Sequence, residues 1–170
     1  DTDDGKIVIT GIANFRGFID VQGRSNDSGA LLNVYAVDTL PSPVLATATS
    51  AAGGGYTTAH VSPNLLTVGT TYFFVVDKAL YVKTAVGVSS VLSTRAYTDL
   101  NTLVLKGGDA NNNEEVDNGD ATCIGGSYGI APSNCGGLGS ADVNTDGKVD
   151  ILDLTLMGGN YGISASTWTP

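Results

Sequence analysis

The 170-residue sequence is short of charge, and it is shortest of positive charge. Charged residues make up 15% of the chain and apolar residues 42%, a composition that excludes a disordered chain. Only 8 lysines and arginines stand against 17 acids, for a net charge of −9. This balance argues against a nucleic-acid partner, whose phosphates would be repelled. No run approaches the roughly 18 consecutive apolar residues of a transmembrane helix, so we expect no membrane insertion.

Histidine and cysteine are also scarce. His60 is the only histidine, and nothing places it beside a serine and an acid as a catalytic triad requires. The only cysteines, Cys123 and Cys135, lack the partners of a zinc site. In an oxidising compartment we expect them to form one disulfide, with a pair of free thiols as the alternative. No basic, apolar leader precedes Asp1, and we expect any signal peptide to have been removed.

The charge is divided unevenly along the chain. Residues 1–106 hold 8 acids and 7 bases, whereas residues 107–170 hold 9 acids and one base, Lys148. The two net charges, −1 and −8, add up to the total of −9. This division predicts two modules, 1–106 and 107–170. The acidic one would repel itself unless it encloses something positive.

The first module has the pattern of β-strands. Apolar runs rich in β-branched and aromatic residues are bounded by Gly, Asn, Asp, Ser or Pro. They lie at residues 7–10, 17–21, 31–37, 45–49, 72–76 and 80–86. Turn signals recur about every 8–12 residues without helical periodicity, which is typical of a β-sandwich. We therefore predict a mainly β chain, in which an antiparallel β-sandwich precedes a small second domain.

The second module contains an internal repeat with an offset of 33 residues. When residues 109–130 are set over residues 142–163, 11 of the 22 positions are identical. The matches include Asp109 with Asp142 and Asp120 with Asp153. A repeat of this kind indicates two copies of one structural unit that pack against each other.

The second copy carries the spacing of a calcium loop, residues 142–153 (the second loop). Calcium takes six to eight oxygen ligands, which one tight loop can supply. A glycine, Gly147, stands at position 6, where such a loop turns sharply. The alternative is a surface turn rich in Asp and Asn. The predicted ligands at positions 1, 3, 5, 7, 9 and 12 are Asp142, Asn144, Asp146, the carbonyl of Lys148, Asp150 and Asp153.

The first copy, residues 109–120 (the first loop), is a weaker version of the same pattern. Position 6 is Glu114, and a residue other than glycine there must adopt a costly positive φ. We expect this site to be looser. Its predicted ligands are Asp109, Asn111, Asn113, the carbonyl of Glu115, Asp117 and Asp120. We also expect Val116 to pair with Val149 in a short bridge, and a short helix to begin at Asp153 and end at Gly158 and Gly159.

Residues 105–163 resemble the type I dockerin domain, a pair of calcium loops each followed by a single helix. The resemblance implies two bound calcium ions. The first module, through Val21-Gln22-Gly23-Arg24, Gly29 and Gly69-Thr70-Thr71-Tyr72, is similar to carboxypeptidase-regulatory-like (transthyretin-like) β-sandwich domains. Such pairs resemble parts of secreted bacterial or archaeal surface proteins, which implies an extracellular or cell-surface location.

The resemblance departs from the dockerin pattern at the recognition positions. Dockerins dock onto cohesin domains, and the cellulosomal ones use hydroxyl residues at loop positions 10 and 11. Here these positions hold Asn118-Gly119 and Ile151-Leu152. Ile151 and Leu152 are apolar, and we expect them to bury against the sandwich or against another subunit.

Three functions fit the sequence. The first is a secreted, non-catalytic, calcium-stabilised structural subunit that associates with copies of itself as a fibre or surface layer, for instance by strand addition of the apolar residues 7–12. The alternative is a dockerin-type adaptor for a cohesin-like receptor. The least expected is a small glycosidase, because 7 of the 17 acids are assigned to calcium and the others show no paired arrangement. We therefore predict that the chain is not an enzyme.

Overall fold

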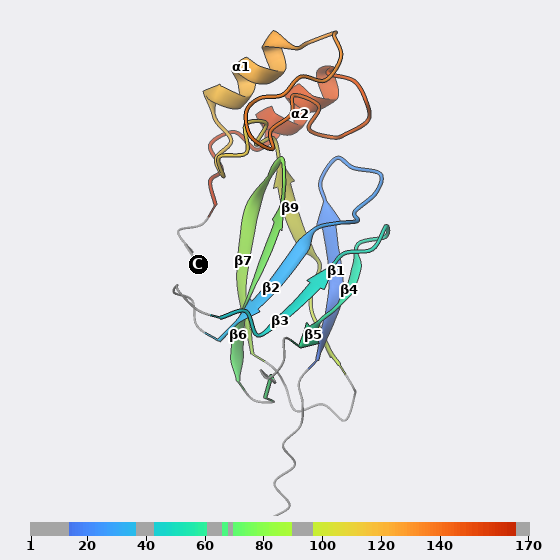
Figure 1. Cartoon of the computed structure of the whole chain (residues 1–170), viewed down its shortest axis with the longest axis vertical. Helices are drawn as coiled ribbons and strands as arrows, with labels where there is room; N and C mark the ends of the chain where they lie inside the picture. Colours follow the sequence, from blue (N-terminus) through green and yellow to red (C-terminus); the bar gives the residue numbers. More distant parts are fainter. Residues whose placement is uncertain (1–13, 37–42, 61–65, 68–69, 90–96, 166–170) are drawn as a thin grey trace, which may run out of the picture.

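A computed structural model describes residues 14–36, 43–60, 66–67, 70–89 and 97–165. These residues form a long β-structure with two short helices at one end (Figure 1). The prediction of a mainly β chain followed by two short helices is confirmed. None of the helices in the described ranges is long and apolar enough to cross a membrane.

Nine strands of the described residues form one sheet in the order β4-β1-β9-β7-β6-β2-β3-β5, with β8 paired to β1. Most pairs are antiparallel, but β1 runs parallel to both β8 and β9, so the sheet is mixed rather than wholly antiparallel. β3 and β4 touch near the two ends of this order, and the sheet is therefore nearly closed. The strands are β1 (Phe15–Val21), β2 (Leu31–Tyr35), β3 (Ala46–Thr49), β4 (Gly55–Thr57), β5 (Ala59–His60), β6 (Thr71–Lys78), β7 (Tyr81–Ser89), β8 (Thr98–Asp99) and β9 (Leu103–Gly107).

Alternation along the strands decides which side chains fill the core. In β1, Phe15, Ile19 and Val21 are buried while Arg16 and Phe18 point outward, as the two-residue period of a strand requires. Phe15 packs edge-on against Phe74 of β6 with 4.8 Å between the ring centroids. This arrangement is a favourable one for aromatic pairs.

Five of the six predicted strand segments lie on strands, and the sixth, residues 7–10, is outside the described residues. The prediction missed β4, β5, β8 and β9. β4, β5 and β8 have at most three residues each, too few for a periodic pattern. The fourth missed strand, β9, is the apolar run at residues 103–105 followed by Lys106 and Gly107.

The two helices are α1 (Asn118–Gly126) and α2 (Ile151–Gly159). Each begins after an aspartate N-cap, Asp117 or Asp150, whose side chain accepts a backbone N–H of the first turn. The aspartate three residues later, Asp120 or Asp153, accepts the N-cap N–H in return, which completes a capping box. α2 therefore begins at Ile151, two residues before the predicted start, because the cap is Asp150.

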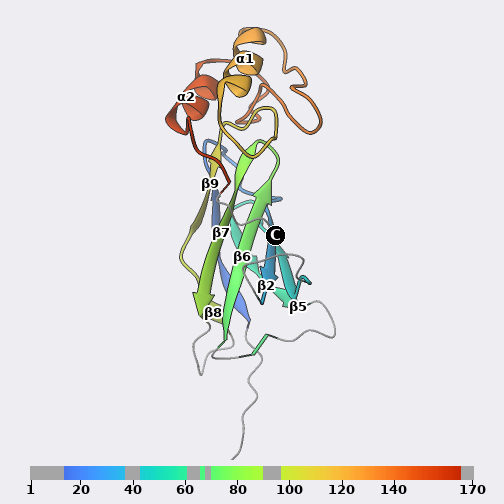
Figure 2. The ribbon, with the colours of Figure 1, turned by 90° about the vertical axis from the view of Figure 1, so that its left-hand side faces the viewer.

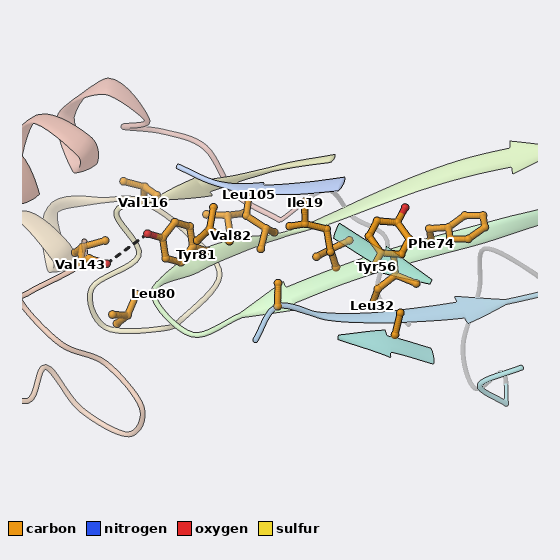
Figure 3. Packing of buried hydrophobic residues seen from close by; sticks show 14 of the residues in the cluster. Ile19, Leu32, Tyr56, Phe74, Leu80, Tyr81, Val82, Leu105, Val116 and Val143 are labelled. Carbon is orange, nitrogen blue, oxygen red and sulfur yellow. Dashed lines mark hydrogen bonds between the residues drawn. The ribbon is translucent and has the colours of Figure 1, made fainter. Parts of the chain in front are cut away.

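One hydrophobic core runs from the sheet into the helical end. Figure 3 shows it passing from Phe74 through Ile19 and Leu105 to Val116 and Val143. Leu156 of α2 lies over Gly107, where an added Cβ would stand 2.8 Å from its Cδ2 atom. The absence of a side chain at Gly107 therefore lets α2 pack directly on the end of β9.

Candidate metal-binding loops

The two loops have the same backbone conformation. Residues at loop positions 4 and 6 adopt positive φ in both: Asn112 (59°) and Glu114 (70°) in the first loop, and Thr145 (57°) and Gly147 (93°) in the second. The expectation that Glu114 must take a positive φ is confirmed. The first loop thus keeps the fold of the repeat despite the missing glycine.

In the second loop, side-chain oxygens accept backbone N–H groups across the turn. The two oxygens of Asp142 accept the N–H groups of Asp146 (3.1 Å) and Gly147 (2.9 Å). Asp153 closes the loop from its far end, accepting the N–H of Val143 at 2.8 Å and of Asp150 at 2.9 Å. These bonds link loop position 1 to positions 5 and 6, and position 12 to positions 2 and 9.

The first loop repeats most of this network, and its bond from Asn111 corresponds to one from the Asn144 N–H to Asp153 at 3.2 Å in the second loop. Asp109 accepts the N–H groups of Asn113 (2.9 Å) and Glu114 (2.8 Å). Asp120 accepts those of Asn111 (3.0 Å) and Asp117 (2.8 Å). All the predicted ligand residues of each copy thus lie on one compact loop that ends in its own helix.

Buried carboxylates without a basic partner are the main electrostatic feature of the loops. Asp109, Asp120, Asp142 and Asp153 are all buried. Burial raises the pKa of Asp109, Asp120 and Asp153, although backbone N–H donors oppose the shift. Within the described ranges, no lysine or arginine forms an ion pair with any of the four. An uncompensated buried negative charge is costly, and a cation would remove that cost.

The donor set suits a hard cation. The described residues contain no group of three or more His, Cys, Asp and Glu side chains placed to hold a metal ion. The predicted sets contain three and four aspartates, so these carboxylates do not converge on one point in this structure. Each set also includes asparagine amides and one backbone carbonyl. Oxygen sets of this mixed composition are those that calcium takes in proteins. The residues therefore fit calcium by their chemistry.

Glu114 has a role that the sequence did not reveal. Its carboxylate accepts the backbone N–H of Lys83 in β7 at 2.8 Å, and it pairs with the Lys83 ammonium at 3.2 Å. Asn112, the other left-handed residue of the first loop, accepts the N–H of Leu80 at 2.9 Å. The first loop is thus fastened to the β6–β7 turn through the two residues whose φ is positive.

The predicted bridge between Val116 and Val149 is wrong. Val116 exchanges backbone hydrogen bonds with the segment after α2, at Gly162 and Ile163, both 2.8 Å long. The carbonyl of Val149 accepts the N–H of Gly129, which follows α1, at 2.9 Å. Each valine pairs with the end of the other copy because the two helices pack against each other.

Helix α2 presents apolar side chains to solvent at its start. Ile151 is 60% exposed and Leu152 55%, so the expected burial against the sandwich does not occur. In the first copy, Asn118 accepts a hydrogen bond from the Tyr161 hydroxyl at 2.9 Å. The two copies thus differ at the recognition positions, one being apolar and the other polar.

Cys123 in α1 and Cys135 in the connector between the copies form a disulfide, as predicted. Their Cα atoms are 5.8 Å apart. This bond ties the start of the long connector to the first helix.

Comparison with known proteins shows the fold. No protein-family model and no curated protein matches the chain. Solved structures do, among them two interface mutants of a type II cohesin–X-dockerin complex from Acetivibrio cellulolyticus. The N-terminal interface mutant matches with a TM-score of 0.65 and 15% identity, and the C-terminal one with 0.62 and 17%. Each alignment covers 90% of this chain and 97% of the other. Both complexes are of type II, whereas the sequence resembled type I dockerins.

Proposed function

We propose that this chain is a calcium-stabilised, non-catalytic adaptor that docks onto a cohesin-like protein through its helical end. The observation that carries the proposal is the doubled loop–helix unit, whose buried carboxylates form no ion pair with a lysine or arginine of the described residues. Calcium in each loop would neutralise these carboxylates and hold the start of its helix. The ligands are the six predicted for each loop.

The coverage of the structural matches supports an adaptor. An alignment over 90% of the chain takes in both the sheet and the helical end, since neither reaches that share alone. The matched chain therefore has both parts, and of the two components of that complex, cohesin and X-dockerin, the second is the one named for two modules. This arrangement supports a role on the dockerin side of such a complex.

The docking surface that we propose begins at Ile151 and Leu152, loop positions 10 and 11 of the second copy. Neighbouring apolar side chains left in water mark interaction sites. The same positions of the first copy, Asn118 and Gly119, offer no such surface. We therefore expect the partner to approach the second copy and to present an apolar patch.

Calorimetric titrations test both calcium binding and cohesin binding. We expect two calcium ions per chain in the wild type and one in Asp142→Ala. With calcium present, the chain should bind at least one member of a panel of type I and type II cohesin modules, and Ile151→Asp with Leu152→Asp should abolish this binding. Tyr128→Ala, a change at an exposed position after α1, serves as the control. Calcium binding without any cohesin binding would leave the metal sites in place and overturn the adaptor.

Self-association is a second candidate. The strand order of the described residues ends at β4 and β5, and such sheet edges can accept an added strand. The apolar segment 7–12 proposed for this role lies outside the described residues. Light scattering of the purified chain in calcium tests self-association. A measured mass equal to that of one chain would contradict a fibre, and the mass of a large assembly would support it.

We also propose an extracellular location, on the strength of the disulfide, since disulfides persist mainly in oxidising compartments. Reaction of the purified natural protein with a thiol reagent, before and after reduction, tests this. Two thiols that react without prior reduction would contradict it.

A further inference from the structure

A shallow cleft of about 730 Å³ lies on the sandwich, away from the loops. Its walls come from β1, β4 and β8, from Thr49 at the end of β3 and from Leu100, which follows β8. Figure 2 shows β8 at the end of the sandwich remote from the helices. The cleft is within the range of about 300–1,000 Å³ that is usual for small-ligand sites. Its lining residues are Arg16, Gly17, Phe18, Thr49, Gly55, Tyr56, Thr57, Asp99 and Leu100.

The strand register places the side chains of the cleft in two rows on the outer face of the sheet. Arg16 pairs with Thr57 on one side and with Asp99 on the other, so these three form a polar row. Phe18 pairs with Gly55, and its ring lies 3.7 Å from where a Cβ of Gly55 would stand. Because Gly55 has no side chain, the space beside the Phe18 ring in this second row is open.

The polar row is electrically neutral and held in place. Arg16 forms a two-pronged ion pair with Asp99 through Nε and Nη2, and its guanidinium lies over the Tyr97 ring at 5.4 Å from the centroid. The Nη1 atom has no hydrogen-bond partner among the described residues. Beside this row, Phe18 is 57% exposed, so its ring is open to a ligand in the cleft.

We propose that this cleft binds a neutral saccharide. A sugar ring has an apolar C–H face, which would lie on the Phe18 ring. Its edge carries hydroxyl groups that both donate and accept hydrogen bonds, and Arg16, Thr49, Thr57 and Asp99 provide both kinds of group. The neutral Arg16–Asp99 pair selects neither an anion nor a cation, which excludes phosphates and basic peptides as the preferred ligand.

The size of the cleft favours a saccharide over a protein partner. A stable protein interface buries about 800 Å² on each side around a cluster of apolar anchors. Here the exposed anchor is a single phenylalanine, and polar side chains surround it on the same face. An extended chain of a few sugar rings matches both the volume and this composition.

The test is an NMR titration of the full chain in calcium with four neutral hexasaccharides: cellohexaose, xylohexaose, mannohexaose and maltohexaose. We expect at least one to shift the amide signals of residues 16–18, 55–57 and 97–100 at millimolar concentration. Phe18→Ala should weaken the binding at least tenfold, and Asp99→Asn at least threefold.

Tyr128→Ala is the matched control, since Tyr128 is an aromatic residue of similar exposure, 48%, at the other end of the molecule. It should leave the affinity unchanged. Circular dichroism checks that the Phe18→Ala chain is folded, as expected for an outward-facing side chain. Absence of shifts with all four sugars, or shifts that Phe18→Ala does not reduce, would overturn the proposal. So would a loss of self-association in Phe18→Ala, which would make the cleft a contact between copies.

Discussion

Glu114 shows how one residue can serve two modules. It stands where the repeat has glycine, in a backbone conformation that costs about 1–2 kcal/mol for a residue with a side chain. In return its carboxylate binds both the backbone and the ammonium of Lys83. The strain inside the loop is thus offset by a connection to the sheet outside it.

This balance predicts an order of stability among variants at position 114. Glu114→Ala loses the bonds but keeps the strained backbone, and we expect it to lower the free energy of unfolding by about 1–2 kcal/mol. Glu114→Gly also loses the bonds but relieves the strain, so its loss should be smaller. Urea unfolding with calcium present measures both. If the glycine variant is the less stable of the two, the positive φ is not a source of strain.

The calcium ligands give a second prediction at this scale. Asp142 and Asp153 stand at the two ends of the second loop and close it, so either change to alanine should remove the gain in melting temperature that calcium gives through this loop. In EDTA, the variants should melt near the wild type, because the loss of the backbone hydrogen bonds offsets the removal of a buried charge. An unchanged response to calcium in the two variants would contradict the site.

Residue types and spacing predicted the two loops and the helix that follows each, and the calcium ligands on them stay a prediction. The same patterns did not reveal what Glu114 and Asn112 contact, because Lys83 and Leu80 lie about thirty residues earlier in the chain. Nor did they predict the outer-face cleft. Its polar row is made of three strands, of which β4 and β8 were too short to be recognised.

At the scale of elements, α2 is anchored by one side and open on the other. Leu156 packs on Gly107 and Gly23 of the sandwich, whereas Ile151 faces solvent. We expect Leu156→Ala to destabilise the chain by about 2–4 kcal/mol through loss of burial and a cavity. Ile151→Ala, on the same helix, should change stability by less than about 0.5 kcal/mol. Equal effects of the two in urea unfolding would mean that α2 does not rest on the sheet.

The disulfide gives a prediction for α1. Cys123 and Cys135 close a loop with a sequence separation of 12 residues, for which chain entropy predicts a stabilisation of about 3 kcal/mol. Replacing both with serine should lower the unfolding free energy by about that amount. Reducing agent should destabilise the wild type equally and leave the double variant unchanged. A double variant as stable as the wild type would show that the connector is ordered without the bond.

The sequence predicted the position of a strand where its apolar run was long enough to be recognised. β6 and β7 have eight and nine residues, and both were recognised by their apolar runs. The parallel pairing of β1 with β9 was not predictable, because residues 21 and 103 are far apart in sequence and no local turn fixes their register.

The whole molecule has a single continuous core, although its charge divides it in two. Buried side chains connect Phe74 to Val116 and Val143 without a break, and the Tyr81 hydroxyl bridges the junction to the Val143 carbonyl (Figure 3). Self-repulsion within the acidic module would by itself favour loosening of that half alone without calcium. The shared core favours a different outcome.

We predict that removing calcium lowers the melting temperature of both parts together. Calcium at a thousand times its dissociation constant adds about 4 kcal/mol per site, and a common core passes that gain to the sheet. Amide signals of Val76 in β6 and Leu154 in α2, followed by NMR on heating in EDTA, should vanish at the same temperature. A sheet that outlasts the helices by several degrees would show that the modules unfold separately.

The close packing of α2 on Gly107 has a mechanical consequence. If a partner holds the helical end while a ligand holds the outer cleft, a pull between them passes along the molecule through β1, β7 and β9. Because β1 and β9 lie parallel and β7 lies beside β9, such a pull would load their hydrogen bonds in shear, all at once, instead of peeling them one by one. The chain would then behave as a stiff tether that holds its length under load.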